Sequence, residues 1–140
     1  MKIAWQEYLS VGVAEIDAQH KLLFENIDAL LTARELGLGS EEVCRLFTFL
    51  DAYVATHFAD EERLMQRIGF PELLKHREHH QVFIGDLSKL KERLGIEGPT
   101  ESLITSVGMV TVGWLIEHIS VMDRAIGRFA KERKQSGPGN

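Results

Sequence analysis

Residues 43–68 read VCRLFTFLDAYVATHFADEERLMQRI, and their apolar positions recur in alternating steps of four and three. This spacing places them along one stripe of an α-helix, the stripe that packs against a core. The members of the stripe are Val43, Phe47, Leu50, Val54, His57, Glu61, Leu64 and Ile68. A histidine and a glutamate therefore share an inward face with aliphatic and aromatic residues.

Three other segments repeat this apolar period, and each of them also places histidine on its inward stripe. The stripes are Ile16, His20, Leu23, Ile27 and Leu30; Leu73, His76, His80, Phe83, Leu87, Leu90 and Leu94; and Thr111, Leu115, His118, Met122, Ala125 and Phe129. Five of the six histidines of the chain therefore lie on stripes that face a predicted core.

The spacing predicts helices over about residues 17–36, 40–67, 71–94 and 100–133. Ser40 and Thr100 are the predicted N-caps of two of them. Because the connections are short, neighbouring helices should run antiparallel. We therefore predict an all-α fold, an up-and-down antiparallel four-helix bundle.

Residues 1–134 should form a single domain, because a chain of 140 residues is long enough for one working core. Residues 1–15 show no sustained helical period and predict an N-terminal arm that folds over the bundle, with Trp5 packing on it. Residues 135–140 are polar and rich in glycine, which is typical of a disordered tail.

Composition argues against several classes of partner. The net charge of -5, with acidic and basic residues interspersed, argues against a nucleic acid partner. The apolar stretch 103–116 is too short to span a bilayer and predicts a buried helix, so no membrane partner is expected. The amino terminus shows no basic segment followed by an apolar run, so a cytoplasmic location is expected.

Cys44 is the only cysteine and is predicted to be a packing residue.

The inward histidines need polar partners. A single histidine of this kind is most often a core residue satisfied by one hydrogen bond. Five imidazoles and a carboxylate in one layer would be costly if unpaired, and they offer too few donors to satisfy one another. A metal centre removes the difficulty, because a cation binds the lone pairs that lack a donor.

Spacing separates candidate ligands from their neighbours. His57 and Glu61 are four residues apart, as are His76 and His80, so each pair can reach a common ion. Glu62 and His79 lie one residue off the stripe, and we expect Glu62 to be a solvated acid and His79 to lie at the surface or behind a ligand. His118 and Asp123 are five residues apart, about 140° around an ideal helix, so periodicity leaves Asp123 open.

The motifs that contain these residues resemble those of the hemerythrin family, in particular its stand-alone bacterial members. The resemblance runs from Trp5 to Asp123. Residues 16–20 match the family's Ile-Asp-x-Gln-His, residues 57–61 its His-x-x-x-Glu, and residues 76–80 its His-x-x-x-His. Residues 118–123 match the last motif, a histidine followed five residues later by an aspartate. His79 is an additional histidine, and Glu117 stands where a neutral polar residue is expected; we expect Glu117 to point away from the metals.

The resemblance implies a non-heme centre of two iron ions joined by an oxo or hydroxo bridge. The implied ligands are His20, His57, Glu61, His76, His80, His118 and Asp123. Glu61 and Asp123 would bridge the two irons, while His76, His80 and His118 would bind one iron and His20 and His57 the other. With two octahedral ions this ligand set leaves one position open, on the iron with two histidines.

Apolar residues near these ligands could form an oxygen pocket that excludes water. The candidates are Leu23, Phe58, Trp114, Leu115 and Ile119, with Leu115 the strongest because it lies one turn before His118. The alternative is that these residues are core residues only, and both roles are compatible.

The function that the resemblance implies is reversible binding of dioxygen, for storage, delivery or sensing, in a protein that is not primarily an enzyme. The partner is then dioxygen, with any protein acceptor of oxygen unidentified. The first alternative is a diiron enzyme that scavenges peroxide or nitric oxide. The second is a sensor module whose output requires a partner.

Overall fold

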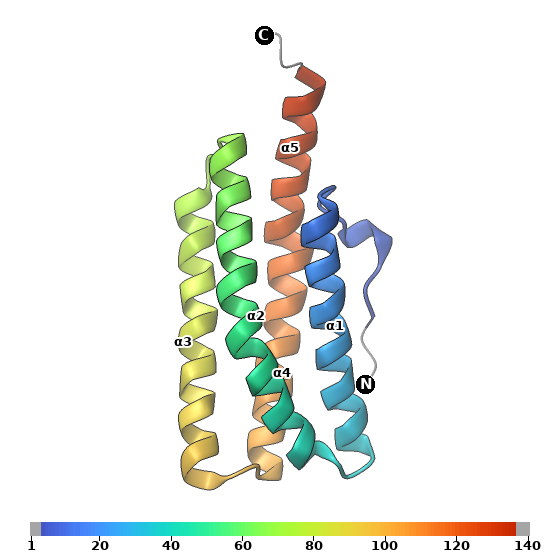
Figure 1. Ribbon diagram of the computed structural model, residues 1–140, viewed down its shortest axis with the longest axis vertical. Coiled ribbons are helices and arrows are strands. Elements are labelled where there is room, and N and C mark those ends of the chain that lie inside the picture. The colour runs from blue at the N-terminus through green and yellow to red at the C-terminus, as the bar shows by residue number, and fades with distance from the viewer. Residues whose placement is uncertain (1–3, 137–140) are drawn as a thin grey trace.

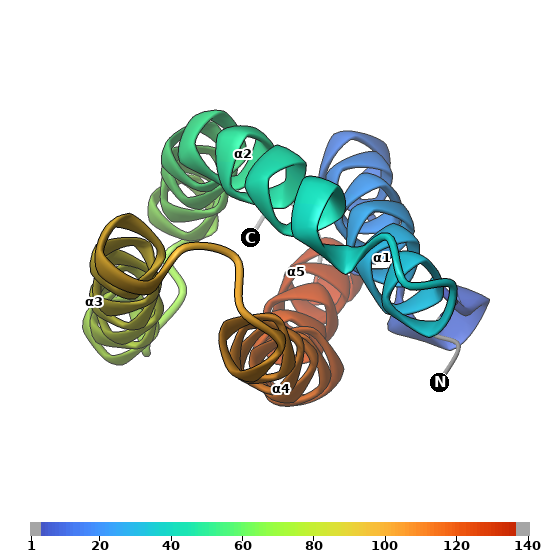
Figure 2. The ribbon, with the colours of Figure 1, turned by 90° about the horizontal axis from the view of Figure 1, so that it is seen from below.

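Four antiparallel helical columns form the protein, which is all-α as predicted (Figure 1). The computed structural model describes residues 4–136, with side chains up to residue 133. The elements are the 3-10 helix η1 (Glu7–Leu9), α1 (Ala14–Glu35), α2 (Gly39–Ile68), α3 (Leu73–Glu97), α4 (Glu101–Glu117), the π-helix η2 (His118–Asp123) and α5 (Arg124–Ser136). The last three follow one another along a single column (Figure 1). Seen along the bundle, the four columns surround one interior (Figure 2).

The interior has two apolar clusters with the histidine layer between them. The larger cluster contains Leu23, Leu50 and Phe83, whereas the smaller contains Ile16, Leu64 and Ile126. In α1 the order along the helix is Ile16, His20 and Leu23, so the histidine lies between the two clusters. The apolar ends of the bundle thus hold the polar layer away from solvent.

The helix ends show which capping predictions are correct. The Thr100 hydroxyl accepts a hydrogen bond from the Leu103 N–H at 3.1 Å, which confirms that N-cap. The prediction for Ser40 is wrong, because α2 begins one residue earlier at Gly39 and no side chain caps it. Gly39 is itself buried, and a Cβ there would lie 3.2 Å from the Ile104 Cδ1, a tight contact.

The N-terminal arm packs against α1 and α5. Leu9 and Val11 are buried, and Asp17 in the first turn of α1 accepts the Val11 N–H at 2.9 Å together with the Ser10 hydroxyl. Trp5 packs on the larger core cluster. The helix α1 begins at Ala14, so the last two residues of the predicted arm are helical.

Two further expectations, for Cys44 and for the C-terminal tail, can be compared with the structure. Cys44 is exposed, so the prediction of a packing residue is wrong: its position on α2 lies between the buried Val43 and the exposed Arg45, off the inward stripe. Residues 135 and 136 belong to α5, not to a disordered tail, whereas the rest of that predicted tail, 137–140, lies outside the described residues.

The continuous helix Glu101–Arg133 is long and apolar enough to cross a membrane by length and composition alone. However, 44% of its most apolar window is buried inside the bundle, and the core helix of a soluble protein shows the same properties. Its buried residues, which include Leu103, Val107 and Leu115, belong to the larger core cluster. Packing within the bundle therefore accounts for much of its apolar character.

Gly127→Ala should destabilise the protein. A Cβ at this position would lie 2.8 Å from the Val11 Cα and 2.9 Å from the Val11 carbonyl oxygen, so the backbone of the arm would have to move. We expect a loss of roughly 1–3 kcal/mol in the free energy of unfolding, measured with urea. Gly113→Ala in α4 is the matched control, since a Cβ there meets nothing within 4 Å and alanine favours a helix. Equal unfolding free energies for the two variants would contradict this account.

Candidate metal centre

A turn of π-helix brings His118 and Asp123 to the same face of the fourth column. Residues His118–Asp123 form η2, in which backbone hydrogen bonds join residues five apart in place of four. This wider turn returns to the same face after five residues, whereas an ideal α-helix would turn Asp123 about 140° away. Both side chains are completely buried. Asp123 therefore faces the interior together with His118, which the spacing of apolar residues alone had left open.

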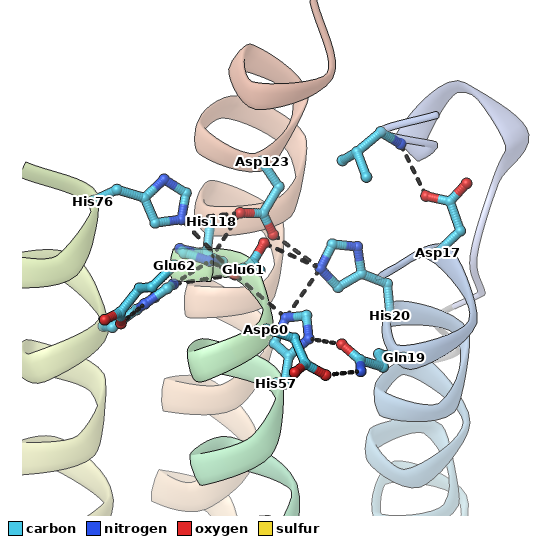
Figure 3. A network of polar contacts seen from close by, with 12 residues as sticks. Asp17, Gln19, His20, His57, Asp60, Glu61, Glu62, His76, His118 and Asp123 are labelled. Carbon is cyan, nitrogen blue, oxygen red and sulfur yellow. Dashed lines mark hydrogen bonds and ion pairs between the residues drawn. The ribbon is translucent and has the colours of Figure 1, made fainter. Parts of the chain in front are cut away.

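All seven sequence-predicted ligand side chains meet in one buried layer. Each residue is at most 1% exposed. Figure 3 shows His20 from α1, His57 and Glu61 from α2, His76 from α3, and His118 and Asp123 from the fourth column pointing toward one another. The Asp123 carboxylate lies 2.9 Å from His20 Nε2, 3.1 Å from His76 Nε2 and 3.0 Å from His118 Nε2.

The seven residues divide into two groups of potential ligand atoms. One group contains Glu61, His76, His80 and His118, and the other contains His20, His57, Glu61 and Asp123. Within each group one atom from every residue lies within 4.8 Å of the others. Glu61 belongs to both groups, so its carboxylate stands where it could bridge two ions.

Several polar atoms of this layer lack hydrogen-bond partners among the described residues. They are His20 Nδ1, Glu61 Oε2, His76 Nε2 and both carboxylate oxygens of Asp123. The Asp123 oxygens lie close to imidazole nitrogens, but the angles do not suit hydrogen bonds. Lone pairs that converge in a buried site without donors are what a cation satisfies. The residues present therefore fit a pair of metal ions.

The carboxylates and imidazoles shift one another's protonation. Burial alone would lower the pKa of His118, but the charges of Asp123 and Glu61 and the hydrogen bond to Glu61 outweigh burial and raise the pKa to about 10. The same carboxylates also outweigh burial at His20 and His76 and raise the pKa of each. At His57 burial prevails and lowers the pKa to about 4.

The two carboxylates shift in the opposite direction. Burial would raise the pKa of Glu61, but the neighbouring His57 and hydrogen bonds from other histidines hold that pKa well below its ordinary value. Burial and the charge of Glu61 would raise the pKa of Asp123, yet His118 and His20 lower it. Both side chains are therefore anionic at neutral pH.

Gln19 contacts the outer nitrogen of His57, a feature that sequence reasoning missed. Gln19 Oε1 lies 2.6 Å from His57 Nδ1, and Gln19 Nε2 donates to Asp60 Oδ2 at 2.7 Å (Figure 3). Tyr53 stacks on the His57 ring, with centroids 5.0 Å apart, and donates its hydroxyl to the Gln19 carbonyl oxygen at 2.7 Å. The only sequence signal was the position of Gln19 beside His20 in the first motif.

Glu62 was expected to be a solvated acid, and that prediction is wrong. Its Oε2 lies 3.0 Å from His80 Nδ1, and its Oε1 accepts from Arg77 Nε at 3.1 Å. Only 22% of the Glu62 side chain is exposed. A position one residue off the stripe is therefore close enough to reach the outer edge of a buried ring.

His79 lies behind a candidate ligand, which was one of its two expected roles. Its Nδ1 is 3.0 Å from His118 Nδ1, and the two rings stack with an interplanar angle of 3°. Glu117, beside His118 in the sequence, is exposed.

The five candidate pocket residues occupy two kinds of environment. Leu23, Leu115 and Ile119 are at most 1% exposed and belong to the larger core cluster. Phe58 stacks on His80, with centroids 3.8 Å apart, and Trp114 stacks on His118 at 4.2 Å. Both aromatic rings thus lie on histidines of the three-histidine group, whereas the pocket was expected beside the other iron.

Comparison with known proteins agrees with this architecture. Residues 11–130 match the family model described as the hemerythrin HHE cation binding domain. Among curated proteins, a bacteriohemerythrin from Stenotrophomonas maltophilia (strain R551-3) is 28% identical over 96% of this chain and 91% of its own length. Another, from Ralstonia nicotianae (strain ATCC BAA-1114 / GMI1000), is 29% identical over 94% of this chain and 90% of its own length.

A third bacteriohemerythrin, from Pseudomonas paraeruginosa (strain DSM 24068 / PA7), is 30% identical over 84% of this chain and 74% of its own length. The family match covers all seven clustered residues, from His20 to Asp123. The layer of histidines and carboxylates suits a metal site, and the chain belongs to the hemerythrin family.

Proposed function

We propose that this protein holds two iron ions in the buried layer and binds dioxygen there reversibly, for storage, delivery or sensing. The observation that carries the proposal is the pair of buried ligand groups that share Glu61. His76, His80 and His118 would hold one iron, His20 and His57 would hold the other, and Glu61 and Asp123 would bridge them. The two irons, when bound through an oxo or hydroxo bridge, supply the electrons and the open position that dioxygen requires.

The residue types favour binding over catalysis. Diiron oxygenases built on helical bundles hold their metals largely with carboxylates, which include a pair of Glu-x-x-His motifs, and this sequence contains no such motif. Neutral imidazoles donate less charge to a metal than carboxylates do. They therefore support high oxidation states less well, so the oxygen–oxygen bond should stay intact.

The apolar side chains around the layer would keep water away from the bound gas. Leu115 and Ile119 are completely buried, one turn before and one residue after His118. Phe58 and Trp114 cover the faces of His80 and His118. A dry surrounding slows hydrolytic loss of a reactive oxygen species, which supports release of oxygen unchanged.

An absorption spectrum of the reduced protein under argon, then air, then argon again tests the proposal. We expect about two irons per chain, counted alongside, and a charge-transfer band that appears in air and disappears when oxygen is removed. Steady consumption of peroxide or nitric oxide with a reductant, without a reversible band, would instead favour the scavenging enzyme. Protein that folds normally with one ion, or with none after iron reconstitution, would contradict both functions.

Leu115→Ala should shorten the lifetime of the oxygenated form. The substitution removes a completely buried side chain one turn from His118 and lets water approach the centre. We expect faster decay of the oxygenated spectrum and a loss of about 2–5 kcal/mol in stability. Ile116→Ala is the matched control, because Ile116 is 54% exposed on the same helix. Equal decay rates in the two variants would remove Leu115 from the pocket.

Metal affinity should rise with pH from about pH 6 to pH 9. The pKa of His118 is raised to about 10 in the metal-free protein, so the protonated ring is favoured below that pH and a metal ion must displace its proton. The pKa of His57 is lowered to about 4, so protons compete at His57 only in acid. A titration with Zn²⁺ at several pH values measures the effect, and an affinity that does not change with pH would contradict it.

A further inference from the structure

Three of the clustered histidines are contacted at their outer nitrogen by three different chemical groups. The pairs are His57 with the amide of Gln19, His118 with the imidazole of His79, and His80 with the carboxylate of Glu62. Of these outer partners only Glu62 is an anion. Hydrogen bonds of this kind orient a ligand imidazole and change how strongly it donates to a metal. The two sides of the centre therefore also differ in the charge of the residues that contact the outer nitrogens of the histidines.

The geometry fixes the direction of the hydrogen bond between His80 and Glu62. His80 Nε2 faces the interior of the layer, 3.1 Å from Glu61 Oε1 and 3.3 Å from His118 Nε2. A ligand nitrogen must present a lone pair, so the ring proton resides on Nδ1. His80 Nδ1 therefore donates to Glu62 Oε2 at 3.0 Å.

Arg77 holds the Glu62 carboxylate in place. It donates from Nε to Glu62 Oε1 at 3.1 Å, so the two carboxylate oxygens serve two different donors. Glu62 comes from α2, whereas Arg77 and His80 both come from α3 and lie three residues apart. The carboxylate thus ties the two helices together directly outside the metal layer.

The contrast with Gln19 isolates the effect of charge. Gln19 also accepts from a ligand histidine and is also held by a second side chain, Asp60. However, its amide oxygen is neutral, and the anion of Asp60 lies on the far side of that amide. Among these three histidines and the side chains that the structure describes, only His80 therefore has a negative charge in direct contact with its outer proton.

We propose that Glu62, oriented by Arg77, is a positioning residue that strengthens His80 as a metal donor and stabilises the oxidised form of the iron that His80 binds. The proposal rests on the proposed diiron function. An anion that accepts the outer proton gives the imidazole partial imidazolate character, and such a ligand favours the more highly charged ion. The iron that His80 would hold is consequently easier to oxidise with Glu62 in place than without its charge.

Glu62→Gln tests the proposal, because glutamine keeps the size and the acceptor of glutamate but removes its charge. Mutation of an outer partner of this kind lowers metal affinity by about 10–100-fold, and we expect loss of the charge alone to lower it within that range, which a Zn²⁺ titration measures without any redox chemistry. We also expect the midpoint potential of the diiron protein to rise. A tenfold weaker preference for the oxidised ion corresponds to about 59 mV for a one-electron couple.

Two further variants distinguish direct contact from other effects. Glu78→Gln removes the same charge from an exposed position on α3, two residues before His80, and should leave zinc affinity and potential nearly unchanged. Arg77→Gln keeps the Glu62 charge but releases its orientation, so it should shift both quantities in the same direction as Glu62→Gln and by less. Arg77→Gln also provides the test if Glu62→Gln fails to fold.

The outcomes separate this proposal from the proposed function. Equal shifts in Glu62→Gln and Glu78→Gln, or none in either, would overturn the role of Glu62. A wild-type protein that takes up no iron would overturn the diiron function instead, while zinc affinity would still report on the Glu62 contact. Weaker zinc binding and a higher potential in Glu62→Gln alone would support the proposal.

Discussion

Seven ionisable side chains share one dry layer of a small bundle, and this burial is the constraint on which the rest of the structure depends. Carboxylates and imidazoles lose their hydration there, and among the described residues several of their atoms find no protein donor. Cations would relieve that cost, so the same ions that would carry the function would also stabilise the fold. The two apolar clusters on either side of the layer keep the helices aligned while they exclude water.

The histidines of the layer differ in the direction of their pKa shifts, and the residues that contact their outer nitrogens add a further difference in charge. Burial is the larger effect at His57 and lowers its pKa, whereas at His118 the charges of Asp123 and Glu61 outweigh burial and raise its pKa. Outside the ring of ligands, a neutral amide and an anion occupy corresponding positions behind His57 and His80. The two halves of the layer are therefore chemically different, and two metal ions held there would have different surroundings.

Much of this architecture can be predicted from the spacing of apolar residues. In residues 43–68 the apolar period repeats often enough to determine which face of the helix is buried. The same stripe brought His57 and Glu61 to the interior without knowledge of any partner helix. Asp123 was beyond this method, since its inward position depends on a π-turn that no spacing rule signals. The prediction for Glu62 was wrong for a related reason. The apolar period predicts the direction in which a side chain points, but it does not predict how far a long side chain reaches toward the next helix. The predicted N-cap at Ser40 was wrong because α2 begins one residue earlier, at Gly39, so Ser40 lies inside the helix.

The π-turn of His118–Asp123 has a consequence for how the chain can change length. A wide turn accommodates one residue more than an α-helical turn, so the fourth column behaves as if a single residue had been inserted between the two metal-facing side chains. Deletion of one residue there would restore regular α-helix and leave the later side chains in place, whereas regular α-helix at the present length would rotate them by about 100°. That rotation would carry Ile126 off the core and Gly127 away from the arm. The helical register of this short segment therefore sets the orientation of side chains in the centre, in the smaller apolar cluster and beneath the N-terminal arm. A change of register would alter all three together.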